Sequence, residues 1–88
     1  MEEWVELRRL AWQCRRGMLE LDELLLAFLR HRYSRQPESI RAAFHRLLFE
    51  DDHRLYRWLF EAPGEAPAAY RELIDRIRRT DARGASRF

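Results

Sequence analysis

The sequence contains a single cysteine, Cys14, among its 88 residues. One thiol can form neither an internal disulfide nor a metal site built from several cysteines. The three histidines, at positions 31, 45 and 53, share no metal-ligand spacing with one another or with Cys14. We therefore expect no metal-binding residues, and we expect Cys14 to be a structural thiol within a helix.

Long hydrophobic segments are also missing. The longest apolar run covers residues 24–29, whereas a helix that spans a bilayer needs about 20 residues. The first ten residues, MEEWVELRRL, begin with acidic side chains and lack the apolar centre and cleavage site of a signal peptide. These absences predict a cytoplasmic protein without direct membrane insertion.

Lysine is absent, and all seventeen basic residues are arginine. A GC-rich coding bias explains this composition, and selection for bidentate anion binding is the alternative. Fifteen acidic residues leave a net charge of only +2, whereas nucleic-acid binders normally carry a strongly basic face with interleaved aromatic residues. We predict no nucleic-acid partner, and we expect residues 81–88 to form a flexible Arg-containing tail.

Glycine is scarce, with three residues in the chain and no glycine-rich phosphate loop. No nucleophile lies in a recognisable catalytic motif, and a domain of this size has little interior for a substrate pocket. We therefore expect no catalytic residues, no cofactor-binding residues and no tightly bound cofactor. A protein-binding module is favoured over an enzyme.

The sequence does contain strong helical periodicity in five segments. Asp51 and Asp52 supply N-cap chemistry before the fourth segment, and the Pro-containing stretch 62–67 is a loop before the fifth. The pattern predicts an all-α fold, a compact five-helix bundle of short amphipathic helices in one helical domain of residues 1–80. The predicted core residues are Trp4, Leu7, Leu10, Ala11, Cys14, Leu21, Leu24, Leu25, Phe28, Leu29, Ile40, Ala43, Phe44, Leu47, Leu48, Leu55, Trp58, Leu59, Tyr70, Leu73, Ile74 and Ile77.

Gly17 is the only glycine among the first 63 residues, and charges of both signs surround it. One interpretation is a helix break, in which Gly17 closes the first helix and Arg15 and Arg16 favour its negative end. The other is a docking corner, in which exposed charges of Arg16 and Glu20 flank a bare stretch of backbone. The two interpretations are compatible.

The residues around this glycine resemble a family signature. Arg16 to Glu20 read RGMLE and fit an RGxxE motif, and residues 15–22 together are similar to the signature of the SdhE-type succinate dehydrogenase flavinylation factors, called succinate dehydrogenase assembly factor 2 in mitochondria. Downstream, residues 44–59, FHRLLFEDDHRLYRWL, resemble the family's F-x-x-L-L…D-x-x-L-x-x-W-L pattern. The resemblance covers about residues 7–78.

Two positions depart from the family's pattern. His53 stands where a proline often starts the fourth helix, which puts the start of that helix in doubt. Phe49 stands where an acidic residue is common, and an exposed phenylalanine there would alter the binding surface.

The resemblance implies an assembly chaperone rather than an enzyme. Such factors bind the flavoprotein subunit of succinate dehydrogenase, and of fumarate reductase in some bacteria, and promote covalent attachment of FAD to that subunit. The implied partner-binding residues are Arg16, Gly17 and Glu20, with Arg15 and Asp22 in support. The factor would act on FAD attachment in its partner.

Two other functions stay open from the sequence. A regulatory or antitoxin-like adaptor would use the same corner to bind a different protein. An Arg-tail nucleic-acid binder would instead use the basic C-terminal residues, and its binding would survive moderate salt.

Overall fold

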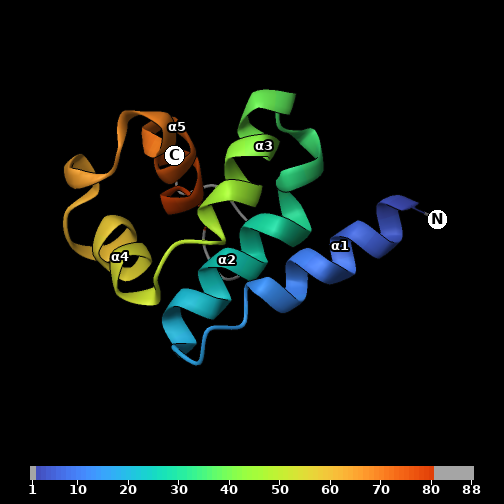
Figure 1. Cartoon of the computed structure of the whole chain (residues 1–88), viewed down its shortest axis with the longest axis horizontal. Coiled ribbons are helices and arrows are strands. Elements are labelled where there is room, and N and C mark those ends of the chain that lie inside the picture. Colours follow the sequence, from blue (N-terminus) through green and yellow to red (C-terminus); the bar gives the residue numbers. More distant parts are fainter. Residues whose placement is uncertain (1, 81–88) are drawn as a thin grey trace.

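Residues 2–80, which a computed structural model of the chain describes, form helices joined by short turns (Figure 1). The predicted all-α, five-helix fold is confirmed. The tail predicted for residues 81–88 lies outside the described residues. The α-helices are α1 (Glu2–Gln13), α2 (Leu19–His31), α3 (Glu38–Leu47), α4 (Asp52–Tyr56) and α5 (Ala68–Arg78). Between them lie two 3-10 helices, η1 (Tyr33–Arg35) and η3 (Pro63–Glu65), and a π-helical turn that follows α4 directly, η2 (Arg57–Glu61).

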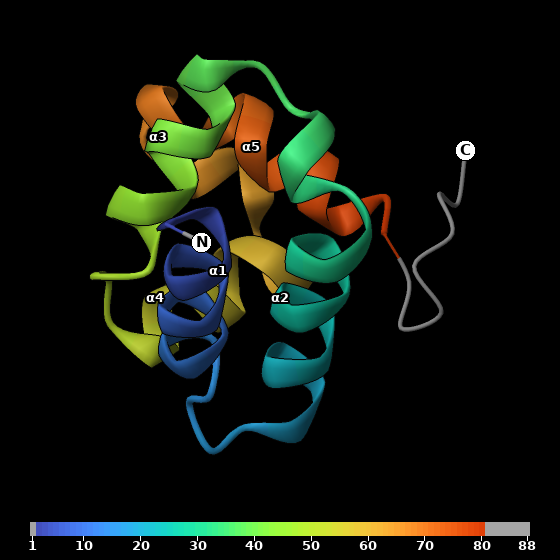
Figure 2. The same ribbon diagram turned by 90° about the vertical axis from the view of Figure 1, so that its right-hand side faces the viewer.

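One continuous apolar core receives side chains from all five α-helices. Helix α5 contacts α2, α3 and η2, and α1 packs against α2 (Figure 2). At the centre, the ring centroids of Phe28 and Phe44 lie 5.2 Å apart, and the ring of Tyr33 lies 5.5 Å from that of Phe44. Every core residue predicted for the last three segments is buried, and only Leu24 of the second is partly buried.

The first helix is less buried than its periodicity predicts. Leu10 and Cys14 are buried, and Leu7 and Ala11 are partly buried against the core. Trp4, however, is 62% exposed, so its assignment to the core is wrong. The reason is geometric: the N-terminal half of α1, to which Trp4 belongs, projects beyond the other helices (Figure 1).

The first helix also ends earlier than predicted. It ends at Gln13, and its last turn is closed by the N–H of Cys14, which donates to the carbonyls of Leu10 and Ala11 at 3.0 and 3.2 Å. Gly17 lies four residues beyond Gln13, so it is not the residue that closes the helix. It belongs instead to the connection between α1 and α2.

The fourth helix begins without a proline. Asp51 is its N-cap, and a carboxylate oxygen of Asp51 accepts the N–H of His53 at 3.5 Å. This confirms the predicted cap and places the start of α4 at Asp52. The helix continues into the wide turn η2, which buries Trp58 against the ring of Tyr70 at 5.9 Å. Within residues 2–80, no helix is long and apolar enough to cross a bilayer.

Candidate partner-binding site

Gly17 lies between α1 and α2, and the turn that joins these helices is at the lower edge of the molecule in Figure 1. Its φ angle is +84°, a left-handed conformation that residues with a side chain rarely adopt. A Cβ atom added at this position would meet no atom within 4 Å. The glycine is therefore required locally by its backbone angle and not by crowding, and it presents bare backbone to the outside.

Asp22 holds this turn in place from the start of α2. Its carboxylate accepts the N–H of Arg16 at 2.8 Å and the N–H of Gly17 at 3.2 Å. Met18, the N-cap residue, makes no side-chain cap of its own. Asp22 thus satisfies two backbone donors just ahead of the helix, where a negative charge is also favoured by the helix dipole.

Arg16 joins the corner to the α3–α4 loop. Its Nε–H donates to the carbonyl of Gln13 at 2.8 Å, and one terminal nitrogen donates to the carbonyl of Glu50 at 2.9 Å and to Asp52 at 2.8 Å. The other terminal nitrogen donates to the carbonyl of Leu48. The Arg16 side chain is only 13% exposed, so the expectation of an exposed charge is wrong there. Three backbone carbonyls and a carboxylate bind its guanidinium group internally.

Other members of the motif face solvent. The guanidinium of Arg15 lies over the ring of Trp12 at 5.7 Å. Glu20 is exposed, and its carboxylate makes no hydrogen bond or ion pair in the described range 2–80. Between them, Leu19 is 73% exposed, and Phe49, in the loop that Arg16 binds, is 81% exposed. Sequence periodicity had not singled out Leu19 as part of this surface.

The structure therefore divides the five predicted partner-binding residues into two groups. Arg16 and Asp22 hold the corner through hydrogen bonds. Arg15, Gly17 and Glu20 are exposed on it and are free to contact another molecule. Direct contact between any of them and a partner stays a prediction.

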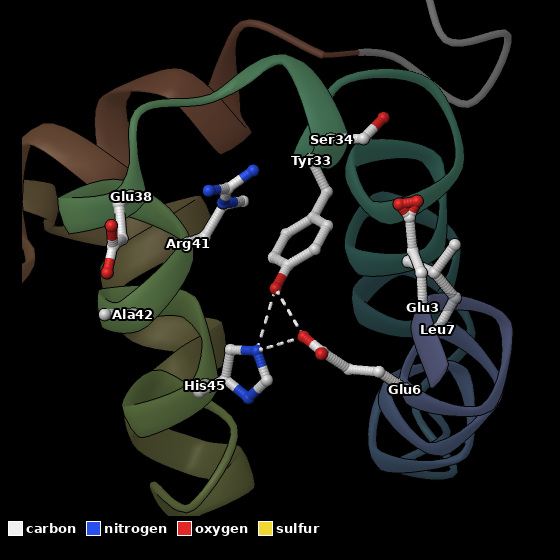
Figure 3. A pocket seen from close by; sticks show the side chains of 9 residues that line it. All are labelled: Glu3, Glu6, Leu7, Tyr33, Ser34, Glu38, Arg41, Ala42 and His45. Carbon is white, nitrogen blue, oxygen red and sulfur yellow. Dashed lines mark hydrogen bonds and ion pairs between the residues drawn. The ribbon is translucent and has the colours of Figure 1, made fainter. Parts of the chain in front are cut away.

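A second feature is a groove of about 780 Å³ between α1, η1 and α3 (Figure 3). On its wall, the hydroxyl of Tyr33 donates to Glu6 at 3.1 Å, and Nε2 of His45 lies 2.8 Å from that hydroxyl and 3.0 Å from the same carboxylate oxygen. Burial and then the bond to Glu6 raise the pKa of Tyr33 to about 12. Sequence spacing could not reveal this cluster, because Glu6 and His45 are 39 positions apart.

The rim of the groove carries charges of both signs. Glu38 and Arg41 are among the charged residues, and the groove is open to solvent. Its polar cluster connects α1 to α3. Among residues 2–80, no group of three or more histidine, cysteine, aspartate or glutamate side chains could hold a metal ion.

Cys14 is free and fully buried next to the corner. Burial raises the pKa of its thiol from 9.0 to about 12. Since the thiolate is the nucleophile, we expect Cys14 of the folded protein to resist a disulfide-exchange reagent such as DTNB near neutral pH. One thiol per chain should react after denaturation. Rapid reaction of the folded protein would contradict the burial.

The same shift predicts a pH dependence of stability. A thiol that ionises near 9 when unfolded and near 12 when folded stabilises the fold fully below pH 9. That contribution should decline as the pH rises from 9 toward 12, by up to about 1.4 kcal/mol per pH unit. Urea unfolding at pH 8, 9 and 10 measures the slope. A Cys14→Ala variant, although less stable overall, should show a flatter dependence over that range.

The comparisons with known proteins agree on one family. A family profile described as a flavinator of succinate dehydrogenase matches residues 8–81. A protein of Xylella fastidiosa named FAD assembly factor SdhE is 41% identical over 78 residues, which cover 89% of this chain and 80% of that protein. A protein of Legionella pneumophila (strain Paris) with the same name is 42% identical over 76 residues, covering 86% and 95%. No solved structure gives a significant match.

Proposed function

Because the chain belongs to the family of succinate dehydrogenase flavinators, we propose that it is an assembly chaperone for the flavoprotein subunit of succinate dehydrogenase. It binds that subunit and promotes covalent attachment of FAD there. The observation that carries the proposal is the exposed Gly17 corner, which lies inside the sequence matched by the family. The flavoprotein subunit of fumarate reductase is a second proposed partner of the same surface.

The proposed role of the chain is orientation rather than chemistry. The flavin and its target residue supply the covalent chemistry, and the bound factor holds the flavoprotein in the geometry in which they meet. The factor itself binds no FAD tightly and has no catalytic residue.

Each corner residue has a distinct part in this proposal. Gly17 lets the partner approach the backbone closely, since no Cβ stands in the way. Glu20 and Arg15 offer opposite charges on either side of it. Arg16 and Asp22 act as positioning residues, and the hydrogen bonds that they make order the corner before it binds, which lowers the entropic cost of docking.

The test uses a strain that lacks the gene. Its succinate dehydrogenase flavoprotein should carry little covalent flavin, measured as in-gel fluorescence, and the wild-type gene should restore it. The variants Gly17→Asn and Glu20→Ala should restore about tenfold less or worse, as expected for residues at the centre of an interface. Purified wild-type protein should co-purify with the flavoprotein subunit, and the two variants should not.

Stability measurements separate docking from folding. Asn adopts the left-handed conformation more readily than other residues with a side chain, so Gly17→Asn should cost less than about 1 kcal/mol while it obstructs the partner. Glu38→Ala is the matched control for Glu20→Ala. Both glutamates are exposed in the first turn of a helix, and their carboxylates make no hydrogen bond or ion pair among residues 2–80. The starts of these two helices, α2 and α3, lie at opposite ends of the molecule (Figure 1). Full rescue by folded Gly17→Asn and Glu20→Ala variants would contradict the proposed contact, and normal covalent flavin in the deletion strain would contradict the function.

A further inference from the structure

The outer face of α1 carries both apolar and basic side chains. It consists of Trp4, Val5, Arg8, Arg9 and Trp12, all of them exposed. Trp4, Val5 and Trp12 are 62%, 53% and 74% exposed, so none of them contributes to the core. Arg8 and Arg9 make no hydrogen bond or ion pair with another side chain in the described part of the chain. The fold therefore gives neither the indoles nor the two guanidinium groups an internal role.

These five residues occupy one arc of the helix. At 3.6 residues per turn they span about 140° of its circumference. The acidic residues Glu3 and Glu6 lie on the other side, on the groove between α1 and α3 (Figure 3). Among residues 3–13, the arc therefore contains two arginines and no acidic residue.

The arc is also convex and unobstructed. The N-terminal half of α1 projects from the bundle (Figure 1), and in the view turned by 90° α1 lies in front of the other helices (Figure 2). Just past the end of the helix, Arg15 places its guanidinium over the ring of Trp12 and extends the basic character of the face. A flat surface could approach α1 without meeting the rest of the molecule.

We propose that the outer face of α1 docks on the surface of a bilayer that contains anionic lipids. Indole rings are favoured at the headgroup level, where one side of the ring is apolar and the other hydrated. Arginines beside them are attracted by the negative surface potential of anionic headgroups. The protein lies on the membrane and does not span it, in agreement with the absence of a spanning helix within residues 2–80.

A lipid surface suits this face better than an acidic protein does. Trp4 and Trp12 stand two turns apart on a convex helix, and a protein partner would need two matching pockets at that separation. A bilayer interface deforms around both rings. The face itself lies on α1 and includes neither Gly17 nor Glu20, so it can be tested apart from the proposed function; Arg15 borders both surfaces.

Vesicle binding by the full chain tests the proposal. The protein should co-sediment with phosphatidylcholine vesicles that contain phosphatidylglycerol, and at least about tenfold less with phosphatidylcholine alone, because surface charge supplies the attraction. Binding should weaken as salt shortens the range of that attraction. Tryptophan emission should shift to the blue on binding, and Trp4→Phe and Trp12→Phe should each remove part of the shift, since Trp58 is already buried.

Charge-matched variants locate the surface. Arg8→Glu/Arg9→Glu should lose binding to the anionic vesicles. Arg35→Glu/Arg46→Glu changes the net charge equally, at two exposed arginines on η1 and α3, and should bind nearly as the wild type does. If both double variants lose vesicle binding equally, the binding depends only on net charge and the proposal is overturned. An absence of wild-type binding to anionic vesicles at low salt would also overturn it.

A third arm separates this surface from the flavinylation site. The Arg8→Glu/Arg9→Glu protein should still bind the flavoprotein subunit, and Glu20→Ala should still bind vesicles. If the arginine variant keeps vesicle binding but loses the flavoprotein, the outer face of α1 is a protein interface and the membrane proposal fails. Circular dichroism melting confirms that each variant is folded.

Discussion

Phe28→Ala is expected to destabilise the protein by about 3–5 kcal/mol. The Phe28 side chain is fully buried on α2 and packs against Phe44, with ring centroids 5.2 Å apart. Truncation removes the buried ring and leaves a cavity that the surrounding helices can fill only in part. Because a domain of this size is stable by only about 5–10 kcal/mol, much of the stability should be lost. Thermal melting followed by circular dichroism should show a decrease in Tm of about 15 °C or more.

Phe49→Ala is the matched control for this prediction. The same chemical change is made at a side chain that is 81% exposed, so the effect should stay within about 0.5 kcal/mol. If Phe28→Ala has the same Tm as the wild type, the placement of α2 at the centre of the core is contradicted. Similar losses in both variants would mean that Phe49 is buried in solution.

Arg16→Ala is expected to cost about 2–3 kcal/mol of stability. The substitution removes the group that bridges α1 to the α3–α4 loop and leaves the carbonyls of Leu48 and Glu50 without their donors. It also leaves Asp52 without its ion pair, although that carboxylate is partly exposed and contributes less. Urea unfolding measures the loss. Arg16→Lys should recover only part of it, because an ammonium group cannot match the planar fork of a guanidinium, which reaches both the Gln13 carbonyl and the acceptors of the α3–α4 loop.

Arg15→Ala provides the control for Arg16→Ala at the neighbouring position. Its side chain is exposed, and beyond the stacking on the ring of Trp12 it makes no hydrogen bond or ion pair among the described residues, so Arg15→Ala should cost less than about 1 kcal/mol. Equal stability of the Arg15 and Arg16 variants would contradict the internal role of Arg16. Combining Arg16→Ala with Asp52→Ala measures the coupling of the pair directly.

These expectations affect how the RGxxE motif is tested. If an Arg16 variant loses flavinylation, the cause could be a disordered corner just as well as a lost contact with the partner. Gly17 and Glu20 avoid this ambiguity, because substitutions there leave every hydrogen bond of the corner in place. The functional test therefore rests on those two positions.

The sequence by itself determined the helices and most of the core. Apolar residues at spacings of three and four depend only on the period of the helix, so the stripes through Phe28, Phe44 and Leu73 were predictable. The cap at Asp51 was equally predictable, because its hydrogen bond closes over two residues. The family resemblance was carried by short motifs of the same local kind.

Only the tertiary structure decided what α1 and the corner do with their side chains. Periodicity assigns Trp4 to the apolar face of its helix but does not show where the neighbouring helices end. Trp4 is exposed because it belongs to the half of α1 that projects beyond them. The sequence predicted an exposed charge at Arg16. In the structure, its guanidinium is bound by acceptors that include Asp52, 36 positions downstream. Contacts at such separations depend on how the helices pack, which local sequence patterns do not encode. Within the described residues, Gly17 and Glu20, which make no hydrogen bonds with distant parts of the sequence, are exposed as predicted. Arg16, which does make such bonds, is not.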